Sequence, residues 1–268
     1  GASGRGRSHG FDLARRGGGR YASGLSRVDI TFVSRHRTGR LKLLLFDIDG
    51  TLLLSGGAGL RALNQAFLEL LGTANAFDGI PVAGRTDPLL LNDATARIGV
   101  LLDKTQRRRF HDRYCDLLEH EILQPGPRKG LMPGVEELLN HVHHQPELCV
   151  GLLTGNFARA ARIKLEYFGL WPFFVCGAYG DDAAQRDELV PVAVARARTA
   201  GNIVCSPAQV VVIGDTPLDI RCATAAGARS IAVATGSFDV QTLERKGATV
   251  VLPDLTDWKA FLAILDEF

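Results

Sequence analysis

The sequence predicts an α/β protein whose parallel sheet is interrupted, after its first strand, by a wholly helical segment. Short apolar runs of strand length, without polar alternation, recur along the chain. Such runs are typical of parallel strands that are buried on both faces. Segments with helical periodicity separate the later runs, and the stretch after the first run has helical periodicity alone. Strands that alternate with helices indicate an α/β fold.

The first predicted strand covers residues 41–46 and ends in the sequence Asp47-Ile48-Asp49-Gly50-Thr51. Asp-Gly is a common hairpin turn, which is the structural interpretation of this segment. Two carboxylates at the end of a buried strand repel each other where little water screens them. We therefore favour a functional role for Asp47 and Asp49.

Residues 57–123 show helical periodicity and contain no clear strand. One face repeats from Leu60 to Leu71, and Asp87-Pro88 predicts an N-cap and first turn for a second helix through Ile98. A third helix is expected over residues 110–122. We therefore expect a helical cap at residues 56–130, an α/β core at residues 41–55 and 131–268, and a basic tail at residues 1–40.

Four later apolar runs continue the predicted sheet, at residues 148–153, 210–213, 230–233 and 249–252. Between them, helices are expected to begin at Pro133, after Asn156 and at Pro217, the last of which ends at Gly227. In a parallel sheet, ligands bind beyond the carboxyl ends of the strands. Polar residues at those ends are therefore the candidates for a functional site.

Two of these later strands end in such residues. Thr154-Gly155-Asn156 leads directly into a helix, where a hydroxyl and free backbone N–H groups suit a phosphate. Its structural alternative is a turn in which Asn156 only caps the helix. Asp215 and Asp219 follow the strand at residues 210–213, and carboxylates of this kind bind Mg²⁺ together with phosphate oxygens. Their alternative roles are a helix cap and a solvated helix residue.

The composition sets limits on the class of protein. The chain has 268 residues, of which 46% are apolar and 22% are charged, so collagen-like and wholly disordered classes are excluded. No apolar run approaches the roughly 18 residues of a membrane-spanning helix, so we expect no membrane partner. The five cysteines lack metal-ligand spacing, which favours a reducing, cytoplasmic location.

The net charge of +2 is unevenly distributed. Residues 1–40 hold nine Arg and two Asp, so they carry +7 and the remainder carries −5. We expect residues 1–24, rich in Gly and Arg, to be disordered. The tail resembles an organelle transit peptide, and its charge would also suit nucleic acid. The third interpretation is that the tail is upstream sequence translated ahead of the real start. We expect no nucleic-acid binding by the core.

Together, the motifs resemble the haloacid dehalogenase-like hydrolase superfamily over about residues 41–255. The resemblance rests on DxDGT at residues 47–51, Thr154 at a later strand end, and GDxxxD at residues 214–219. The helical segment after the first motif resembles the subclass with an α-helical cap, in the branch of phosphoglycolate phosphatase and β-phosphoglucomutase. This resemblance implies a Rossmann-like core with a parallel sheet.

The resemblance also implies catalytic roles. Asp47 matches the nucleophile that forms an aspartyl-phosphate, and Asp49 matches the acid/base that protonates the leaving oxygen and then activates water. Thr154 matches the hydroxyl that binds the phosphate, and the N–H groups of Gly155 and Asn156 are expected to assist it.

A Mg²⁺ cofactor is implied at the same edge of the sheet. The expected ligands are the Asp47 side chain, the main-chain carbonyl of Asp49, and Asp215. Asp219 is expected either to bind the metal directly or to support its ligands.

The family's third motif normally supplies a lysine that holds the nucleophile and the phosphate, but residues 180–189 contain none. Arg186 is our candidate replacement, because a guanidinium keeps its charge and can bind two oxygens. Its structural alternative is an exposed arginine paired with Asp182 or Asp187. Lys164 is the second candidate, although it is expected more than two helical turns beyond Thr154.

The cap is expected to determine which substrate binds. Arg85 in its loop could bind a substrate carboxylate or simply be solvated.

We predict a Mg²⁺-dependent phosphatase for a small phosphorylated metabolite, with phosphoglycolate as the first candidate. A phosphomutase of the β-phosphoglucomutase type and a catalytically inactive binding protein are the alternatives. The sequence leaves the oligomeric state open.

Overall fold

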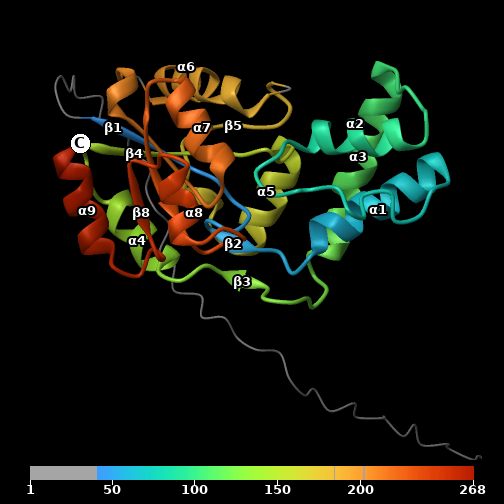
Figure 1. Ribbon diagram of the computed structural model, residues 1–268, viewed down its shortest axis with the longest axis horizontal. Helices are drawn as coiled ribbons and strands as arrows, with labels where there is room; N and C mark the ends of the chain where they lie inside the picture. The colour runs from blue at the N-terminus through green and yellow to red at the C-terminus, as the bar shows by residue number, and fades with distance from the viewer. Residues whose placement is uncertain (1–40, 184, 202) are drawn as a thin grey trace, which may run out of the picture. The chain divides into compact units, whose positions relative to one another are not determined.

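The computed structural model describes residues 41–183, 185–201 and 203–268. The predictions for the tail, residues 1–40, fall outside the described residues. The predicted core and cap segments are both described, so the fold can be followed from the first strand to the C-terminus (Figure 1).

A parallel sheet of six strands forms the centre of the core, in the order β5-β4-β1-β6-β7-β8 (Figure 1). The strands are β1 Lys42–Phe46, β4 Leu148–Leu153, β5 Cys176–Ala178, β6 Val210–Gly214, β7 Arg229–Val233 and β8 Val250–Leu252. Phe46 at the end of β1 pairs with Leu152 on one side and Ile213 on the other. The carboxyl ends of β1, β4 and β6 therefore lie next to one another, and the predicted parallel sheet is confirmed.

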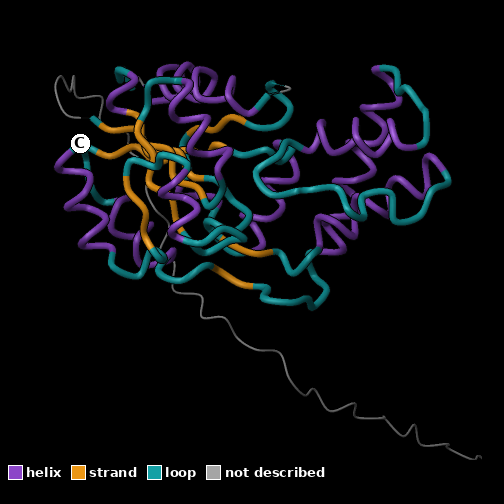
Figure 2. Tube along the Cα trace, viewed as in Figure 1, coloured by secondary structure: helices purple, strands orange, loops and turns teal. Residues whose placement is uncertain are grey.

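Helices cover both faces of this sheet (Figure 2). Leu44 and Phe46 of β1 belong to a hydrophobic cluster with α4 (Val135–His143), α5 (Ala158–Tyr167) and α9 (Trp258–Glu267). Leu43 and Leu45 belong to a cluster with α6 (Leu189–Gly201) and α7 (Pro217–Ala225). Successive strand residues point to opposite faces, which is why the strand sequences are apolar throughout. The helices are α4 Val135–His143, α5 Ala158–Tyr167, α6 Leu189–Gly201, α7 Pro217–Ala225, α8 Val240–Arg245 and α9 Trp258–Glu267, with 3₁₀ turns η1 Trp171–Phe173, η2 Arg186–Glu188 and η3 Pro207–Gln209.

The segment between β1 and α4 is mainly helical and forms a hydrophobic cluster distinct from those around the sheet, to which the core contributes Phe157 and Ala160. Phe67, Phe77 and Phe110 meet in it, with ring centroids 5.6–6.3 Å apart. Its helices are α1 Ala58–Leu71, α2 Asp87–Arg97 and α3 Lys104–Glu121, and a short antiparallel pair, β2 Leu53–Leu54 and β3 Gly130–Leu131, lies where the segment leaves and rejoins the core. We interpret residues 56–130 as a cap because of this separate cluster.

Several details differ from the sequence predictions, including the third cap helix, which begins at Lys104 rather than at residue 110. The edge strand β5 and the β2–β3 pair were not expected, because these runs of two or three residues are too short for periodicity and glycines interrupt β5 and β3, whereas the equally short β8 is wholly apolar and branched. The N-cap of α2 is Thr86 rather than Asp87, since the Thr86 side chain accepts the Leu89 N–H. Asp87 is therefore free to use its carboxylate elsewhere.

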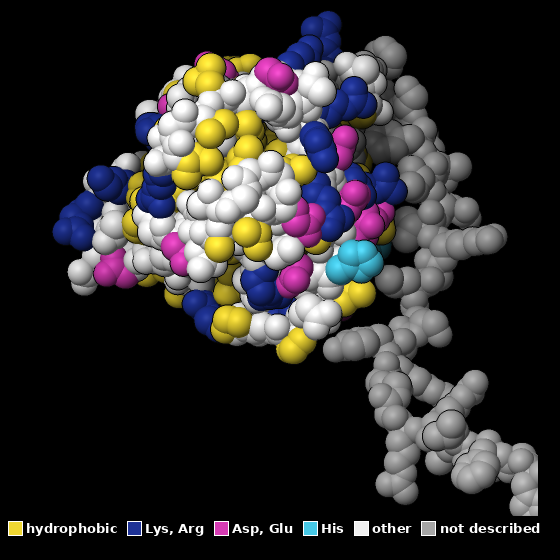
Figure 3. Space-filling model, turned by 90° about the vertical axis from the view of Figure 1, so that its right-hand side faces the viewer, with side chains coloured by type: hydrophobic (Ala, Val, Ile, Leu, Met, Phe, Trp, Pro, Cys, Tyr) yellow, Lys and Arg dark blue, Asp and Glu magenta, His cyan; other side chains and the backbone are white. Residues whose placement is uncertain are grey.

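Among the described helices, none combines the length and the apolar character needed to cross a bilayer. The face shown in Figure 3 carries basic and acidic side chains interspersed with hydrophobic ones. A nucleic-acid-binding face is usually dominated by Lys and Arg. The surface in this view therefore lacks the charge pattern of such an interface.

Candidate active site

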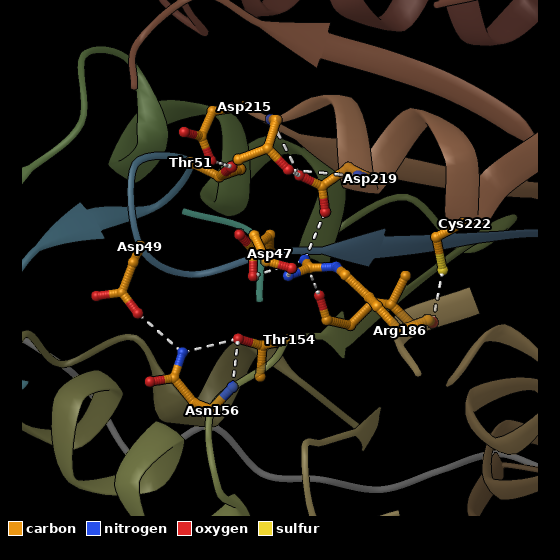
Figure 4. Close-up of polar contacts among 12 residues, drawn as sticks. Asp47, Asp49, Thr51, Thr154, Asn156, Arg186, Asp215, Asp219 and Cys222 are labelled. Carbon is orange, nitrogen blue, oxygen red and sulfur yellow. Dashed lines mark hydrogen bonds and ion pairs between the residues drawn. The ribbon is translucent and has the colours of Figure 1, made fainter. Parts of the chain in front are cut away.

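The ends of β1, β4 and β6 bring the predicted site residues together (Figure 4). Asp47 directly follows β1, and its N–H continues the sheet by donating to the Ile213 carbonyl at 2.9 Å. The residue is buried, with 4% of its surface exposed. Gly50 has a φ of +92°, and a Cβ there would lie 2.5 Å from Asp215 Oδ2. Only glycine lets the loop after β1 turn so close to Asp215.

Arg186 is the cation beside Asp47. It is 3% exposed, and its Nη2 atom lies 2.9 Å from Asp47 Oδ1 and 2.5 Å from Asp219 Oδ1. Nη1 and Nη2 also donate to the carbonyls of Gly84 and Leu153, at 2.9 and 3.1 Å. One guanidinium thus connects the ends of β1 and β4, helix α7 and the cap.

The alternative of an exposed, loop-paired arginine is wrong for this position. Asp182 pairs with Arg196, and Asp187 pairs with Arg221. Burial would lower the pKa of Arg186, but the carboxylates of Asp219 and Asp47 outweigh it and raise that pKa above its ordinary value. Its buried Nε atom has no hydrogen-bond partner among the described residues.

Three buried carboxylates form an acidic cluster here. Oxygen atoms of Asp47, Asp215 and Asp219 all lie within 4.8 Å of one another. Burial, followed by the charges of Asp47 and Asp219, raises the pKa of Asp215 to about 8. Burial raises the pKa of Asp219 to about 6, although Arg186 opposes the shift. Crowded and poorly solvated carboxylate oxygens are a donor set that fits a divalent cation such as Mg²⁺.

Within this cluster, Asp219 differs from the other two members. Its Oδ1 atom contacts Arg186, and its Oδ2 atom accepts from the Thr216 N–H at 3.0 Å and the Thr216 hydroxyl at 2.7 Å. Both oxygens therefore already have partners in the protein. Of the two roles expected for Asp219, this geometry favours supporting the site over binding a metal directly.

Asp49 lies on the side of Asp47 that is opposite Arg186 (Figure 4). Lys164 Nζ lies 2.8 and 2.6 Å from its two carboxylate oxygens, and Asn156 Nδ2 donates to Oδ2 at 2.8 Å. Lys164 reaches Asp49 from its place well along α5, because helical side chains lean toward the N-terminus of their helix. Lys164 is 4% exposed and binds Asp49 rather than the nucleophile.

Thr154 is fully buried at the end of β4. Its hydroxyl oxygen accepts hydrogen bonds from the Asn156 N–H at 3.3 Å and from Asn156 Nδ2 at 2.8 Å. The hydroxyl proton is therefore directed elsewhere and can be donated to a ligand. The Asn156 N–H, which we expected to bind phosphate, is used within the loop instead, whereas the Gly155 N–H has no acceptor among the described residues.

Asp87 joins the cap to the loop after β4, a role that the sequence did not predict. Its N–H donates to the Gly155 carbonyl at 2.8 Å, and its carboxylate accepts the Phe157 N–H at 2.8 Å. It is 6% exposed, and burial raises its pKa to about 7 although Lys164 opposes the shift. Thr86 and Asp87 are both residue types that can serve as the N-cap of α2. The sequence alone therefore does not show that the Asp87 carboxylate turns inward.

A cavity of about 420 Å³ separates the core residues from the cap. Asp47, Asp49 and Asp215 line its floor, while apolar cap residues, including Leu63 and Leu90, line its walls. Its volume is within the range of small-molecule sites. Tyr114, a buried residue of the cap, also lines the cavity, a position that its helical periodicity did not predict.

The expected role of Arg85 needs a correction. Arg85 lines the cavity, but its guanidinium lies 2.7 Å from Asp93 and also donates to the Pro81 carbonyl at 3.2 Å. Within the described structure it is therefore neither free nor simply solvated. An arginine that must leave a carboxylate is a poor candidate for the first contact with a substrate anion.

The chain is similar to known proteins in both sequence and structure. The HAD-hydrolase-like protein family matches residues 190–258. The chain is 28% identical over 213 residues to a phosphoglycolate phosphatase of Chromobacterium violaceum, covering 76% of this chain and 89% of that one. It is 24% identical over 232 residues to a phosphoglycolate phosphatase of Pseudomonas putida, covering 80% and 77%. A hydrolase from Pseudomonas syringae has a similar structure, with a TM-score of 0.59, 24% identity, and coverage of 85% and 99%.

Proposed function

Because the chain belongs to the haloacid dehalogenase-like hydrolase superfamily, we propose that it hydrolyses a small phosphorylated metabolite through an aspartyl-phosphate on Asp47. Phosphoglycolate is the first candidate substrate, since it is the substrate named for two of the similar proteins. The observation that carries the proposal is the position of Asp47, between a buried guanidinium and the two acids Asp215 and Asp219.

In the first step, the Asp47 oxygen that does not contact Arg186 attacks the phosphorus atom. A new O–P bond forms, and the bond between phosphorus and the ester oxygen breaks. Asp49 donates a proton to the departing oxygen, and Lys164 and Asn156 hold its carboxyl group in position. Arg186 and the Thr154 hydroxyl stabilise the charge on the phosphoryl oxygens.

In the second step, Asp49 takes a proton from water, whose oxygen attacks the phosphorus of the aspartyl-phosphate. The acyl-phosphate bond breaks, inorganic phosphate leaves, and Asp47 returns as a carboxylate. Asp47, Asp215 and the main-chain carbonyl of Asp49 would hold Mg²⁺, with Asp219 positioning Arg186. When bound, the cation neutralises the crowded carboxylates and the phosphate, which lets one anion attack another.

The test is phosphate release from phosphoglycolate, sugar phosphates, nucleotides, pyrophosphate and an aryl phosphate, each with Mg²⁺ and with a chelator. We expect Mg²⁺-dependent release that Asp47→Asn abolishes. Asp78→Asn, which changes an exposed carboxylate of the cap, is the matched control and should retain full activity. Release that persists in Asp47→Asn would overturn the aspartyl-phosphate mechanism. Transfer of phosphate between sugar positions without release would instead identify a mutase.

A further inference from the structure

Arg128 is a cation in the wall of the cavity to which the proposed mechanism gives no role. It lies on the segment that returns from the cap to the core, and its side chain is exposed and lines the cavity. The other cationic side chains that line the cavity all have carboxylate partners: Arg85 with Asp93, Lys164 with Asp49, and Arg186 with Asp47 and Asp219. No described carboxylate forms an ion pair with Arg128.

The backbone at Arg128 has an unusual conformation. Its φ is +52°, and the only other described non-glycine residue with a positive φ is Asn75, a residue type that tolerates this region. Arg128 occupies the third position of a turn in which Pro127 is second and the Lys129 N–H bonds to the Gly126 carbonyl. Glycine is favoured at such a position. An arginine with this strain points to a use for its side chain.

Arg128 is also held beside the catalytic loops. Its Nη2 atom donates to the Thr235 carbonyl at 3.2 Å, and the Thr235 hydroxyl donates to the Gly50 carbonyl at 2.5 Å. The following residue, Gly236, is so close to Asp215 that a Cβ there would lie 1.7 Å from Oδ2. The hydrogen bond to the Thr235 carbonyl uses one of the five N–H donors of the Arg128 guanidinium, so the other four remain available.

The neighbouring Lys129 provides a contrast. Its Nζ atom donates to the carbonyls of Ile122 and Gln124 and lies over the Tyr167 ring. Lys129 therefore stabilises the end of α3 and the loop after it. Of these two adjacent cations, only Arg128 presents its charge to the cavity.

From these contacts, we infer that Arg128 binds a second anionic group of the substrate, a carboxylate or a second phosphate, distinct from the phosphate that is cleaved. This inference rests on the proposed phosphatase function. The reacting phosphate has its own donors in Arg186 and Thr154. Arg128 lies between α3 and β3 and lines the same cavity, where it would meet the part of the substrate that extends away from the reaction.

The test compares pairs of substrates that differ in one anionic group. Phosphoglycolate is paired with ethyl phosphate, and fructose 1,6-bisphosphate is paired with fructose 6-phosphate. For the doubly anionic member that wild-type protein prefers, we expect Arg128→Met to lower kcat/KM by about 10- to 100-fold, mainly through KM. The singly anionic member should change by less than about threefold, and Arg128→Lys should restore part of the loss.

Arg109→Met is the matched control, because Arg109 is an exposed cap arginine that does not line the cavity. It should change neither member of a pair. Equal losses for both members in Arg128→Met, or no loss for either, would overturn the assignment. Whichever pair shows the selective loss identifies the second group as a carboxylate or a phosphate.

If wild-type protein releases phosphate from no substrate, the proposed function fails but the role of Arg128 can still be measured. Binding of phosphoglycolate and ethyl phosphate is then compared by calorimetry in wild-type protein and Arg128→Met. Selective weakening of phosphoglycolate binding supports the assignment. Equal binding by both proteins refutes it.

Discussion

The buried carboxyl group of Asp87 should make the stability of the protein depend on pH. Burial raises its pKa to about 7 from an ordinary value of 3.8, although Lys164 opposes the shift. In the unfolded chain the group loses its proton near pH 4, whereas in the folded protein it keeps the proton to about pH 7. Between these values the folded state binds more protons, so the free energy of unfolding falls as the pH rises.

The expected magnitude follows from this difference in pKa. Each unit corresponds to about 1.4 kcal/mol, so Asp87 should cost wild-type protein roughly 2–3 kcal/mol of stability between pH 5 and pH 9. Asp87→Asn removes the titration but keeps an oxygen that can accept the Phe157 N–H. The variant should therefore gain stability relative to wild type as the pH rises, and the gain should level off above about pH 8.

The assay is urea unfolding followed by circular dichroism at pH 5 to 9, with a chelator present throughout. Other buried acids titrate in both proteins, so the difference between wild type and Asp87→Asn isolates the contribution of Asp87. Asp78→Asn is the control at an exposed carboxylate, and its difference from wild type should stay flat. A difference for Asp87→Asn that does not change with pH would refute the assigned environment of this group.

Two further predictions concern the other buried ionic contacts. Arg186→Ala leaves the carboxylates of Asp47 and Asp219 without their cation, so urea unfolding at pH 8 should show a loss of about 3–5 kcal/mol. Lys164→Met removes the ammonium that holds Asp49, so kcat for an alkyl phosphate should fall by about 10²-fold. An aryl phosphate, whose leaving group needs no proton, should lose much less in the same kinetic assay.

Each of these variants has a control with the same change at an exposed position. Arg196→Ala breaks the partly exposed pair with Asp182 and should cost less than about 1 kcal/mol. Lys104→Met alters the exposed start of α3 and should leave both substrates unaffected. If Arg186→Ala were no more destabilising than Arg196→Ala, the ion pairs of Arg186 would be unimportant for folding. Equal losses for alkyl and aryl substrates would separate Lys164 from proton transfer.

Much of the core was predictable because its strands are apolar throughout and are separated by periodic helices. The register of β1 with β4 and β6 then brings Asp47, Thr154 and Asp215 to one edge of the sheet, so their proximity also follows from the order of the motifs. The short strand β5 has too few residues to show a pattern.

The parts of the site that were missed depend on side-chain direction across the boundary between core and cap. Lys164 reaches Asp49 by leaning back along α5, and Asp87 turns its carboxylate toward the Phe157 N–H instead of capping its own helix. Arg128 could not be singled out, because exposed arginines in loops are common in sequences of this composition. Its significance depends on a positive φ and on the lack of an ion-pair partner, neither of which a sequence displays.

The bonds between the loop before α2 and the core have a consequence for how this protein can diverge. Arg186 donates to the Gly84 carbonyl, and the Asp87 N–H donates to the Gly155 carbonyl, so in both bonds the cap contributes a main-chain group. Main-chain groups persist when side chains change. The side chains that line the cavity from the cap can therefore be exchanged during evolution or by design while these two attachments are kept. New substrate preferences can thus arise without rebuilding the catalytic edge of the sheet.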